Sequence, residues 1–422
     1  MQELVGTLPV ESRRLGRHLT ELSQISGTGD GVSRPFPSPA HLDGRAWLEH
    51  RFRAAGLGVR TDHAGNLHGI LPGRRSACVI VGGHSDSVPH GGAFDGALGV
   101  LAGLEIAQTL AERSVTPEFT LDVMDCLAEE PTAFGLSCIG SRGFAGRLTH
   151  QDVDRRDLEG RSLAEAIRAA GGNPDVLGPV DPDTPVRAYL ELHIEQGPVL
   201  ASTPGSLGAV TGIVGIIRQA FAIRGDAAHA GTTPLEHRHD AAVAAARAII
   251  AVHDLAVRTP GGVATVGELH LFPNVPNVVP GEAKGVLELR SADAGLLDRL
   301  ARELLDAMAT AVHESGCSFT SDLAKSTRPT PMTPDLVDLI AAAIAAEGSL
   351  PVRLPSGGGH DAVEMSSRAP VGMLFAPCRD GVSHHPSEWV EEKDLDRALG
   401  AYARAVLALV SPPAEGGTSH VL

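Results

Sequence analysis

The spacing of apolar residues changes several times along the first half of the chain. Apolar positions recur about every 3.6 residues over 11–26 and 40–57, which predicts two amphipathic helices, and segment 100–113 also predicts a helix. Short apolar runs bounded by turn residues predict strands at 77–84, 118–130 and 187–197. The strand–helix–strand order predicts βαβ units and a mixed, mostly parallel sheet in an α/β fold. Ligands bind at the carboxyl ends of strands in such sheets, and all three runs end in ionisable residues.

The pattern changes from about residue 207 onward. Strands and helices then follow in the order β-α-β-β-α, which fits a small ferredoxin-like α+β module. After a further strand, helices at 334–348 and 391–410 return the chain to an α/β pattern. We therefore predict an α/β domain formed by 1–206 and 323–422, with an inserted domain at 207–322. The tail at 411–422 is predicted to be disordered.

Composition supports a globular protein and excludes several partners. Of the 422 residues, 43% are apolar and 20% are charged, which is enough to build a normal core. The formal charge is −16, and no basic block is present. Nucleic acids and anionic membranes are therefore not expected as main partners, because both attract clusters of lysine and arginine.

The cysteines and the apolar runs bear on the compartment. The five cysteines form no CxxC pair and cannot all be paired, so we expect reduced thiols in the cytoplasm. No uninterrupted apolar stretch approaches the roughly 18 residues that a transmembrane helix needs. The N-terminal sequence lacks the apolar run and cleavage site of a signal peptide.

Two segments place acidic residues and a histidine at predicted strand ends. In GGHSDSVPHGGAFDGALGV, His84 and Asp86 end a buried strand, and Asp95 follows in a glycine-flanked loop. In LAEEPTAFG, Glu129 and Glu130 end another strand, where burial is costly unless a cation or proton compensates. Neighbouring strand residues point oppositely, so one glutamate can bind a metal while the other faces a substrate. The alternatives are a structural His–Asp pair and acids at a solvated helix N-terminus.

Two more segments supply histidines. His193 ends the strand in LELHIEQG, and His384 and His385 lie in a turn in DGVSHHPSEW. Taken singly, a satisfied core histidine or a surface histidine explains each of them. Taken together, three histidines, one aspartate and one glutamate at the strand ends of one sheet predict a two-metal site, for which zinc or manganese is suitable. The neighbouring glutamate would then act as a general base.

The inserted domain carries polar residues of its own. His229, Asn277 and Arg290 are donors that can hold a carboxylate or stabilise an oxyanion. The alternatives are local: PNVPNVVPG can be a hairpin turn, and Arg290 can form a surface ion pair. SGGGHDA at 356–362 follows neither the GxGxxG pattern nor that of a P-loop, so nucleotide binding is not expected.

The segments HIEQGPVL, HAGTTP, NVVPG, SGGGHDA and SHHPSE, in this order, resemble one enzyme superfamily. It is the dinuclear-zinc aminoacylase and carboxypeptidase-like peptidase superfamily. The likeness is strongest to its amidase–hydantoinase–carbamoylase branch, which includes N-carbamoyl-L-amino acid hydrolases, β-ureidopropionases and allantoate amidohydrolases. It extends from about residue 31 to the end of the last predicted helix.

The resemblance implies a metal-ligand set. His84 and His193 would hold one ion, Glu130 and His384 the other, and Asp95 would bridge both. It favours His384 over His385, and a histidine at 193, where the aminopeptidase branches carry an acid, marks the carbamoylase branch.

The resemblance also implies roles around the metals. Glu129 matches the general base, Asp86 the residue that orients His84, and His229 the oxyanion donor. Asn277 and Arg290 would bind the substrate carboxylate. The residues implied to line the site are Gln196, Gly358, Gly359 and His360. The inserted domain would form a homodimer, bring His229 and Asn277 to the partner's site and close as a lid over the catalytic α/β domain.

The sequence departs from the branch in two places. After Glu130 it reads Pro131-Thr132-Ala133-Phe134-Gly135 instead of Gly-Ser-Arg-Phe-Gly, and LELR, with Glu288, replaces the more common Asp-Ile-Arg. The first change removes an arginine, which is a planar bidentate donor. Hydrolysis remains the expectation, but both changes point away from the usual substrate and toward a specialised amide.

These observations predict a metal-dependent amidohydrolase. It would cleave a linear C–N bond of an N-carbamoyl or related N-acyl amino acid or ureide, using a water that bridges the metals and is activated by Glu129. One alternative is an aminoacylase or dipeptidase, and a remote one is a metal-binding scaffold without activity. His193 argues against the first, and the intact ligand set argues against the second.

Overall fold

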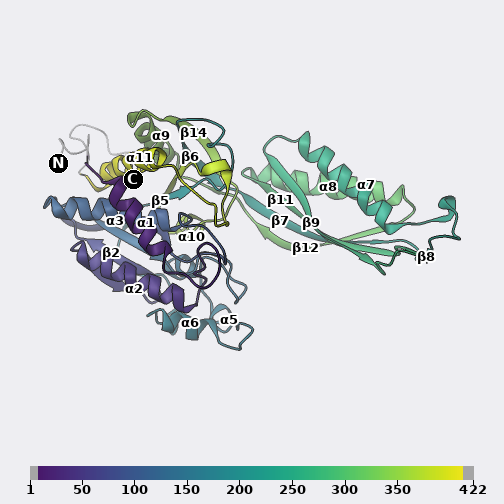
Figure 1. The fold of residues 1–422 in the computed structure, drawn as a ribbon, viewed down its shortest axis with the longest axis horizontal. Helices are drawn as coiled ribbons and strands as arrows, with labels where there is room; N and C mark the ends of the chain where they lie inside the picture. Colours follow the sequence, from purple (N-terminus) through teal and green to yellow (C-terminus); the bar gives the residue numbers. More distant parts are fainter. Residues whose placement is uncertain (1–7, 412–422) are drawn as a thin grey trace. The chain divides into compact units, whose positions relative to one another are not determined.

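The structure is a computed structural model that describes residues 8–411. The chain divides into two compact units, one comprising Met1–Thr211 and Met332–Leu422 and the other Gly212–Pro331 (Figure 1). The second unit thus begins and ends later than the predicted 207–322, because strand β6 (Ser206–Ile213) pairs in the first unit and strand β12 (Ser318–Thr327) completes the second. The predicted disordered tail lies, apart from Ser411, outside the described residues.

The first unit contains a nine-stranded mixed sheet with the strand order β1-β2-β4-β3-β5-β15-β6-β13, with β14 also paired to β6. Strands β4, β3, β5 and β15 are mutually parallel and form its centre. The remaining pairs along this order are antiparallel. The other strand bounds are β1 (Gly58–Thr61), β2 (Leu67–Leu71), β3 (Arg75–His84), β4 (Phe119–Cys126), β5 (Val186–Ile194), β13 (Thr330–Pro331), β14 (Leu350–Ser356) and β15 (Val371–Ala376).

Long helices cover one face of this sheet. Helices α2 (Pro39–Ala54) and α3 (Ala97–Glu112) share that face, because Gly69 of β2 packs on Phe52 and the paired Val123 packs on Gly103. The other helices of this unit are α1 (Ser12–Ser23), α4 (Ile139–Phe144), α5 (His150–Val153), α6 (Leu163–Ala169), α9 (Pro334–Ala346), α10 (Ala362–Met365) and α11 (Glu392–Val410). Helix α3 lies very close to the sheet, since a Cβ on Gly99 would meet the carbonyl oxygens of Gly82 at 2.3 Å and Leu192 at 2.6 Å.

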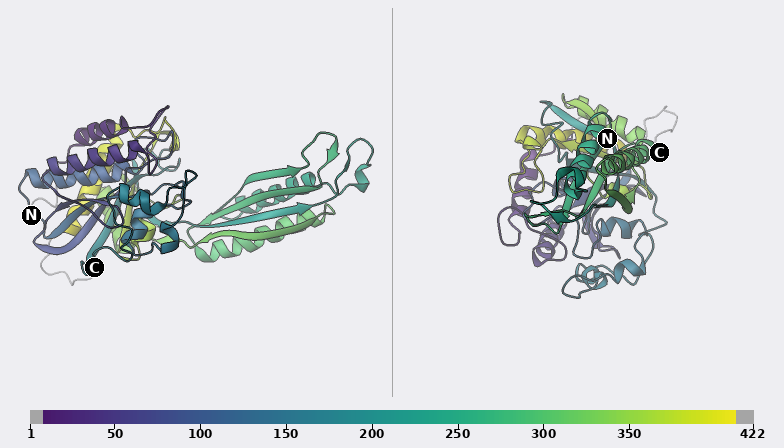
Figure 2. Two further views of the ribbon diagram at one scale, coloured as in Figure 1. Left: turned by 90° about the horizontal axis from the view of Figure 1, so that it is seen from below. Right: turned by 90° about the vertical axis from the view of Figure 1, so that its right-hand side faces the viewer.

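The second unit is a ferredoxin-like module. Its antiparallel sheet has the order β12-β7-β11-β9, and helices α7 and α8 pack on each other and on the sheet (Figure 2). A two-stranded ribbon pairs β8 with β10. The bounds are β7 (Gly215–Arg224), β8 (Ala228–His229), α7 (Ala241–Val257), β9 (Gly262–Phe272), β10 (Val278–Val279), β11 (Glu282–Ser291) and α8 (Ala294–His313).

The predicted fold class is confirmed, and the differences lie at element ends. The predicted strand at 118–130 ends at Cys126, and the one at 187–197 ends at Ile194. In both cases the residues beyond the strand turn away into loops, with Ala128 and Gln196 at positive φ. Among residues 8–411, no helix combines the length and apolarity needed to cross a bilayer.

Candidate metal centre

Parallel strands bring two predicted ligands to one edge of the sheet. His84 is the last residue of β3, and His193 is the penultimate residue of β5, its neighbour. Asp95 lies in the loop before α3, next to Gly96, which has a φ of 64°. A Cβ on Gly96 would lie 2.3 Å from His84 Nε2, so only glycine lets this loop approach the histidine so closely.

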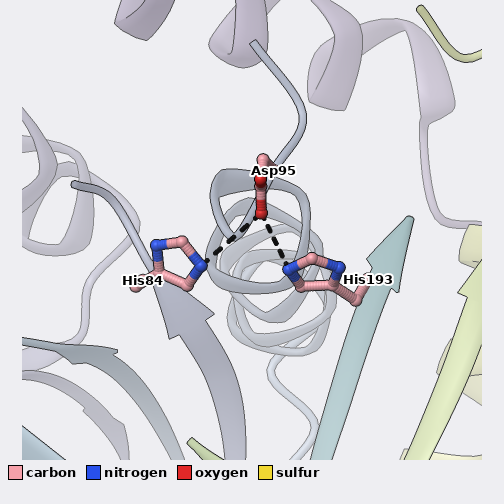
Figure 3. A group of neighbouring side chains, drawn as sticks. All are labelled: His84, Asp95 and His193. Carbon is pink, nitrogen blue, oxygen red and sulfur yellow. Dashed lines mark ion pairs between the residues drawn. The ribbon is translucent and has the colours of Figure 1, made fainter. Parts of the chain in front are cut away.

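The Asp95 carboxylate is the centre of the cluster. Its Oδ1 lies 3.0 Å from His193 Nε2 and 3.7 Å from His84 Nε2, and Figure 3 shows the carboxylate directed at both rings. Its Oδ2 lies 2.9 Å from His384 Nε2, which is also 3.4 Å from Glu130 Oε1. His385 instead bonds Ser387. The structure therefore brings together all five predicted ligands in two groups that share Asp95.

The hydrogen bonds of the two buried histidines suit a metal ion. His84 Nδ1 lies 3.1 Å from the Asp86 carbonyl oxygen, and His193 Nδ1 lies 2.9 Å from that of Ile194. Each Nδ1 therefore carries a proton, so in a neutral ring Nε2 presents its lone pair to Asp95. A lone pair facing a carboxylate is repulsive unless a proton or a metal cation lies between them. The donor set of imidazole and carboxylate thus fits two divalent ions of the zinc or manganese type.

Glu129 and Glu130 are buried, but they are not strand residues. Strand β4 ends at Cys126, so the predicted strand alternation does not explain their different directions. Instead, the Asp86 carboxylate accepts the backbone N–H of Glu129 at 3.1 Å and that of Glu130 at 3.2 Å. The alternative of solvated acids at a helix N-terminus is wrong, because both side chains are buried and α4 begins only at Ile139.

Asp86 also supports the first histidine. Its Oδ1 lies 3.4 Å from His84 Nδ1, and the whole residue is buried. One carboxylate therefore fixes both the ring of His84 and the backbone of the Glu129–Glu130 loop. This geometry fits the orienting role expected for Asp86.

The acids and imidazoles shift each other's pKa in opposite directions. Burial raises the pKa of Asp95, but hydrogen bonds with His193 and His384 outweigh it and hold that pKa well below its usual value. The hydrogen bond to Asp95 raises the pKa of His384 to about 9. Burial raises the pKa of Glu129 well above its usual value and that of Glu130 to about 7. Bound cations would favour the ionised form of both glutamates.

Residues to which we assigned no role complete the cluster. Glu388 is buried, and its Oε1 accepts the backbone N–H of Phe94 at 2.9 Å and of Asp95 at 3.0 Å. Ser383 donates to Glu388 Oε2 at 2.9 Å. Glu388 is part of the SHHPSE motif, but nothing in the pattern indicated that it would hold a loop almost 300 positions earlier in the chain.

Gln196 lies at the exposed side of the cluster. Its Nε2 donates to Asp95 Oδ2 at 2.9 Å, and it is half-buried. A Cβ on Gly358 would lie 3.0 Å from Gln196 Oε1, so the loop at 357–359 borders this side chain. These contacts fit a lining role for Gln196, Gly358 and Gly359.

His360 has a different place from the one we expected. It is buried with its ring centroid 4.5 Å from that of His193, and its Nε2 lies 2.8 Å from Ser356 Oγ. Glu191 Oε1 lies 3.8 Å from its Nδ1. The ring therefore packs behind His193 and supports it, whereas Gly357 and Gly359 before it are exposed.

The three predicted residues of the second unit do not form one cluster. His229 lies in the β8–β10 ribbon and Asn277 directly precedes β10, where the Ala230 N–H donates to the Asn277 carbonyl oxygen at 2.9 Å. Strand β11 begins at Glu282, just after the ribbon ends at Val279. Arg290 lies eight residues further along this strand, which corresponds to about 27 Å at the usual rise.

The Arg290 guanidinium bonds Glu288 with distances of 2.8 and 2.6 Å. Glu288 also accepts from Arg218, so the half-buried acid lies between two arginines.

The loop that departs from the expected pattern keeps a defined shape. Thr132 Oγ1 donates to the Leu136 carbonyl oxygen at 2.7 Å, and Phe134 is buried beside Phe36. Ala133 is exposed, so a methyl group stands where the resemblance implies an arginine.

The chain is similar in sequence to known hydrolases. Residues 80–408 match the model of peptidase family M20/M25/M40. An N-carbamoyl-L-amino acid amidohydrolase of Geobacillus stearothermophilus is 39% identical over 397 residues, covering 93% of this chain and 96% of that protein. An allantoate amidohydrolase of Escherichia coli (strain K12) is 34% identical over 378 residues, covering 88% and 92%.

The fold comparison gives the same result. The crystal structure of a hydantoinase/carbamoylase family amidase from Burkholderia multivorans has a TM-score of 0.91 and 31% identity, and the match covers 96% of this chain and 99% of that one. Because the residues that match the family model span most of the sequence, this chain belongs to peptidase family M20/M25/M40.

Proposed function

We propose that this protein is a metal-dependent amidohydrolase that cleaves a linear C–N bond of an N-carbamoyl or related N-acyl amino acid or ureide. The observation that carries the proposal is the position of Asp95 between His84 and His193 on one side and His384 on the other, with Glu129 held nearby. The names of the amidohydrolase relatives support the substrate class.

The residues divide into two sets around the shared carboxylate. His84, Asp95 and His193 would hold one divalent ion, and Asp95, Glu130 and His384 would hold the other. Zinc and manganese both suit this donor set. Such ions, when bound, supply Lewis-acid polarisation of the scissile carbonyl and lower the pKa of the attacking water.

Glu129 is the residue that moves the proton. Its Oε2 lies 3.7 Å from His84 Nε2, so the carboxylate borders the metal centre. Glu129 would accept a proton from the attacking water and donate it to the leaving nitrogen as the C–N bond breaks. For a carbamoyl substrate, the released carbamate then decays to ammonia and carbon dioxide.

A second copy of the chain would complete the site. His229 and Asn277 lie at the end of the second unit opposite to Arg290, so one copy of this unit cannot present all three to the same small substrate. We infer a homodimer in which His229 and Asn277 serve the partner's site as oxyanion and carboxylate donors, and Arg290 also binds a substrate carboxylate.

We place the protein in the cytoplasm. All five cysteines are free thiols, and four of them are buried, which suits a reducing compartment.

The role of Glu129 is tested with Glu129→Gln. This variant keeps the shape of the side chain but removes the proton acceptor, so we expect bound metal to stay at the wild-type level and turnover to fall by about 100-fold or more. Metal content is measured by atomic spectroscopy, and turnover by ammonia release. The control is Glu159→Gln, which changes an exposed glutamate of the same unit. A Glu129→Gln enzyme with full metal and near-normal turnover would refute the assignment.

A further inference from the structure

Cys138 lies beside the carboxylate that we assign as the proton acceptor. Its Sγ is 3.6 Å from Glu129 Oε1, a distance at which the thiol donates a weak hydrogen bond. Its backbone N–H donates to the Glu129 carbonyl oxygen at 2.9 Å. Within residues 8–411, no other side chain donates a hydrogen bond to this carboxylate, whose Oε2 faces His84.

The local backbone fixes the direction of the thiol. Cys138 is the N-cap residue of α4 and has a φ of 54°, a conformation that is uncommon for residues other than glycine. Helix α4 is anchored at two residues just after this position. The Gly140 N–H donates to the Leu127 carbonyl oxygen at 2.7 Å, and Ser141 Oγ donates to the buried Asp361 at 2.6 Å. The cysteine is therefore held against the loop that carries Glu129.

We propose that Cys138 is a positioning residue for Glu129, whose thiol holds Oε1 so that Oε2 stays turned toward His84 and the metal centre. The inference rests on the proposed function, because it matters for catalysis only if Glu129 moves the proton. Burial, together with the nearby charges of Glu129 and Asp361, raises the pKa of this thiol well above its usual value. The sulfur therefore keeps the proton that it donates.

Two substitutions separate the hydrogen bond from packing. Cys138→Ala removes only the sulfur and keeps the Cβ, so the left-handed backbone is equally strained before and after the change. Cys138→Ser replaces the thiol by a stronger donor. The matched control is Cys317→Ala, which removes a buried thiol from the second unit.

The kinetic test uses the full chain loaded with zinc or manganese and an N-carbamoyl amino acid. For Cys138→Ala we expect kcat to fall about three- to tenfold, with KM and bound metal unchanged. Cys138→Ser should keep at least about half of the wild-type kcat, and Cys317→Ala should match the wild type. A Cys138→Ala enzyme with wild-type kcat, or a serine variant as impaired as the alanine variant, would overturn the proposal.

A second measurement needs neither substrate nor metal. The infrared S–H stretching band of Cys138, assigned by its absence in Cys138→Ser, should move to higher frequency in Glu129→Ala, because the acceptor is lost. An unmoved band would overturn the proposal even if the enzyme hydrolyses the expected substrate. A shifted band in a protein without hydrolytic activity would uphold the contact and refute the proposed function instead.

Discussion

Asp86 shows how a single residue can determine a metal centre without facing a substrate. Its carboxylate accepts two backbone N–H groups from the Glu129–Glu130 loop and lies next to the ring of His84. Removing it would leave two buried donors unpaired and free the imidazole to rotate. The positions of a proposed ligand and of the proposed proton acceptor therefore depend on the same side chain.

We predict that Asp86→Ala lowers metal affinity about 10- to 100-fold and turnover at least as much, since residues that orient metal ligands have effects of this size. Asp86→Asn keeps one acceptor oxygen and should fall between the alanine variant and the wild type. Titration with zinc after chelation measures the affinity. Asp338→Ala, which removes an exposed carboxylate, is the control. Wild-type zinc affinity in Asp86→Ala would contradict this role.

At the same scale, the sequence indicates which candidate ligands lie together better than it indicates the residues that support them. His84 and His193 follow from the pattern, because both end apolar strands whose carboxyl ends meet at one edge of the sheet. Glu388 and Cys138 could not be predicted in this way. Each acts by contacting a residue on another loop, and neither contact leaves a periodic signal in the sequence.

At the scale of elements, a buried charge cluster joins the β1–β2 hairpin to β4. His68 of β2 is fully buried, with Nδ1 2.9 Å from Asp122 of β4 and Nε2 3.1 Å from Asp62 in the hairpin turn. Asp62 also accepts from the backbone N–H and the side chain of Asn66. An imidazolium between two carboxylates thus connects three segments of the first unit.

This cluster predicts a pH-dependent stability. Burial lowers the pKa of His68, but Asp122 and Asp62 outweigh it and raise the pKa to about 9. The unfolded-state value is about 6.5, so the stabilisation is complete below pH 6.5 and is lost as the pH rises through about 9. The difference between the two values corresponds to about 3 kcal/mol.

Urea unfolding of the chelated protein at a series of pH values measures this effect. We expect the free energy of unfolding of the wild type to fall between pH 6.5 and 9 by up to about 3 kcal/mol more than that of His68→Gln. Comparing the two proteins cancels the titration of the metal-site histidines, which both retain. Parallel curves for the two proteins would show that His68 does not carry the predicted charge.

The elements themselves were largely predictable, and their ends were not. Periodicity located the helices and central strands, including α9, which runs from Pro334 to Ala346 against a predicted 334–348. The extent of β4 depended on Ala128, whose positive φ turns the chain out of the strand direction, although alanine carries no signal for such a turn. The end of the second unit depended on β12, whose pairing with β7 continues to Thr327.

At the scale of the whole molecule, the residues assigned to substrate lie in both units. The candidate metal ligands belong to the first unit, whereas His229, Asn277 and Arg290 belong to the second. The sequence indicated these donors but could not indicate that β11 separates Arg290 from the other two. That separation follows from the length of β11, and it is the reason to infer a second subunit.

The dimer predicts complementation between two inactive variants. Glu129→Gln lacks the proton acceptor, and His229→Ala lacks the oxyanion donor. If His229 serves the partner's site, a mixed dimer contains one complete site, and random reassociation should restore about a quarter of wild-type turnover. The mixture is assayed after partial denaturation and refolding, with each variant refolded alone as control. A mixture as inactive as its components would contradict the shared site.

The central claim is that the cluster around Asp95 makes this protein a metal-dependent hydrolase of N-carbamoyl or related N-acyl amino acids. The most direct measurement compares turnover of N-carbamoyl amino acids, ureides such as allantoate, N-acetyl amino acids and dipeptides by the purified protein. It is made after chelation and again after refilling with zinc or manganese. We predict no turnover after chelation and recovery with metal, with the highest kcat/KM on the carbamoyl or ureide substrates. Metal-independent turnover, a clear preference for dipeptides, or stoichiometric metal without turnover of any substrate would contradict it.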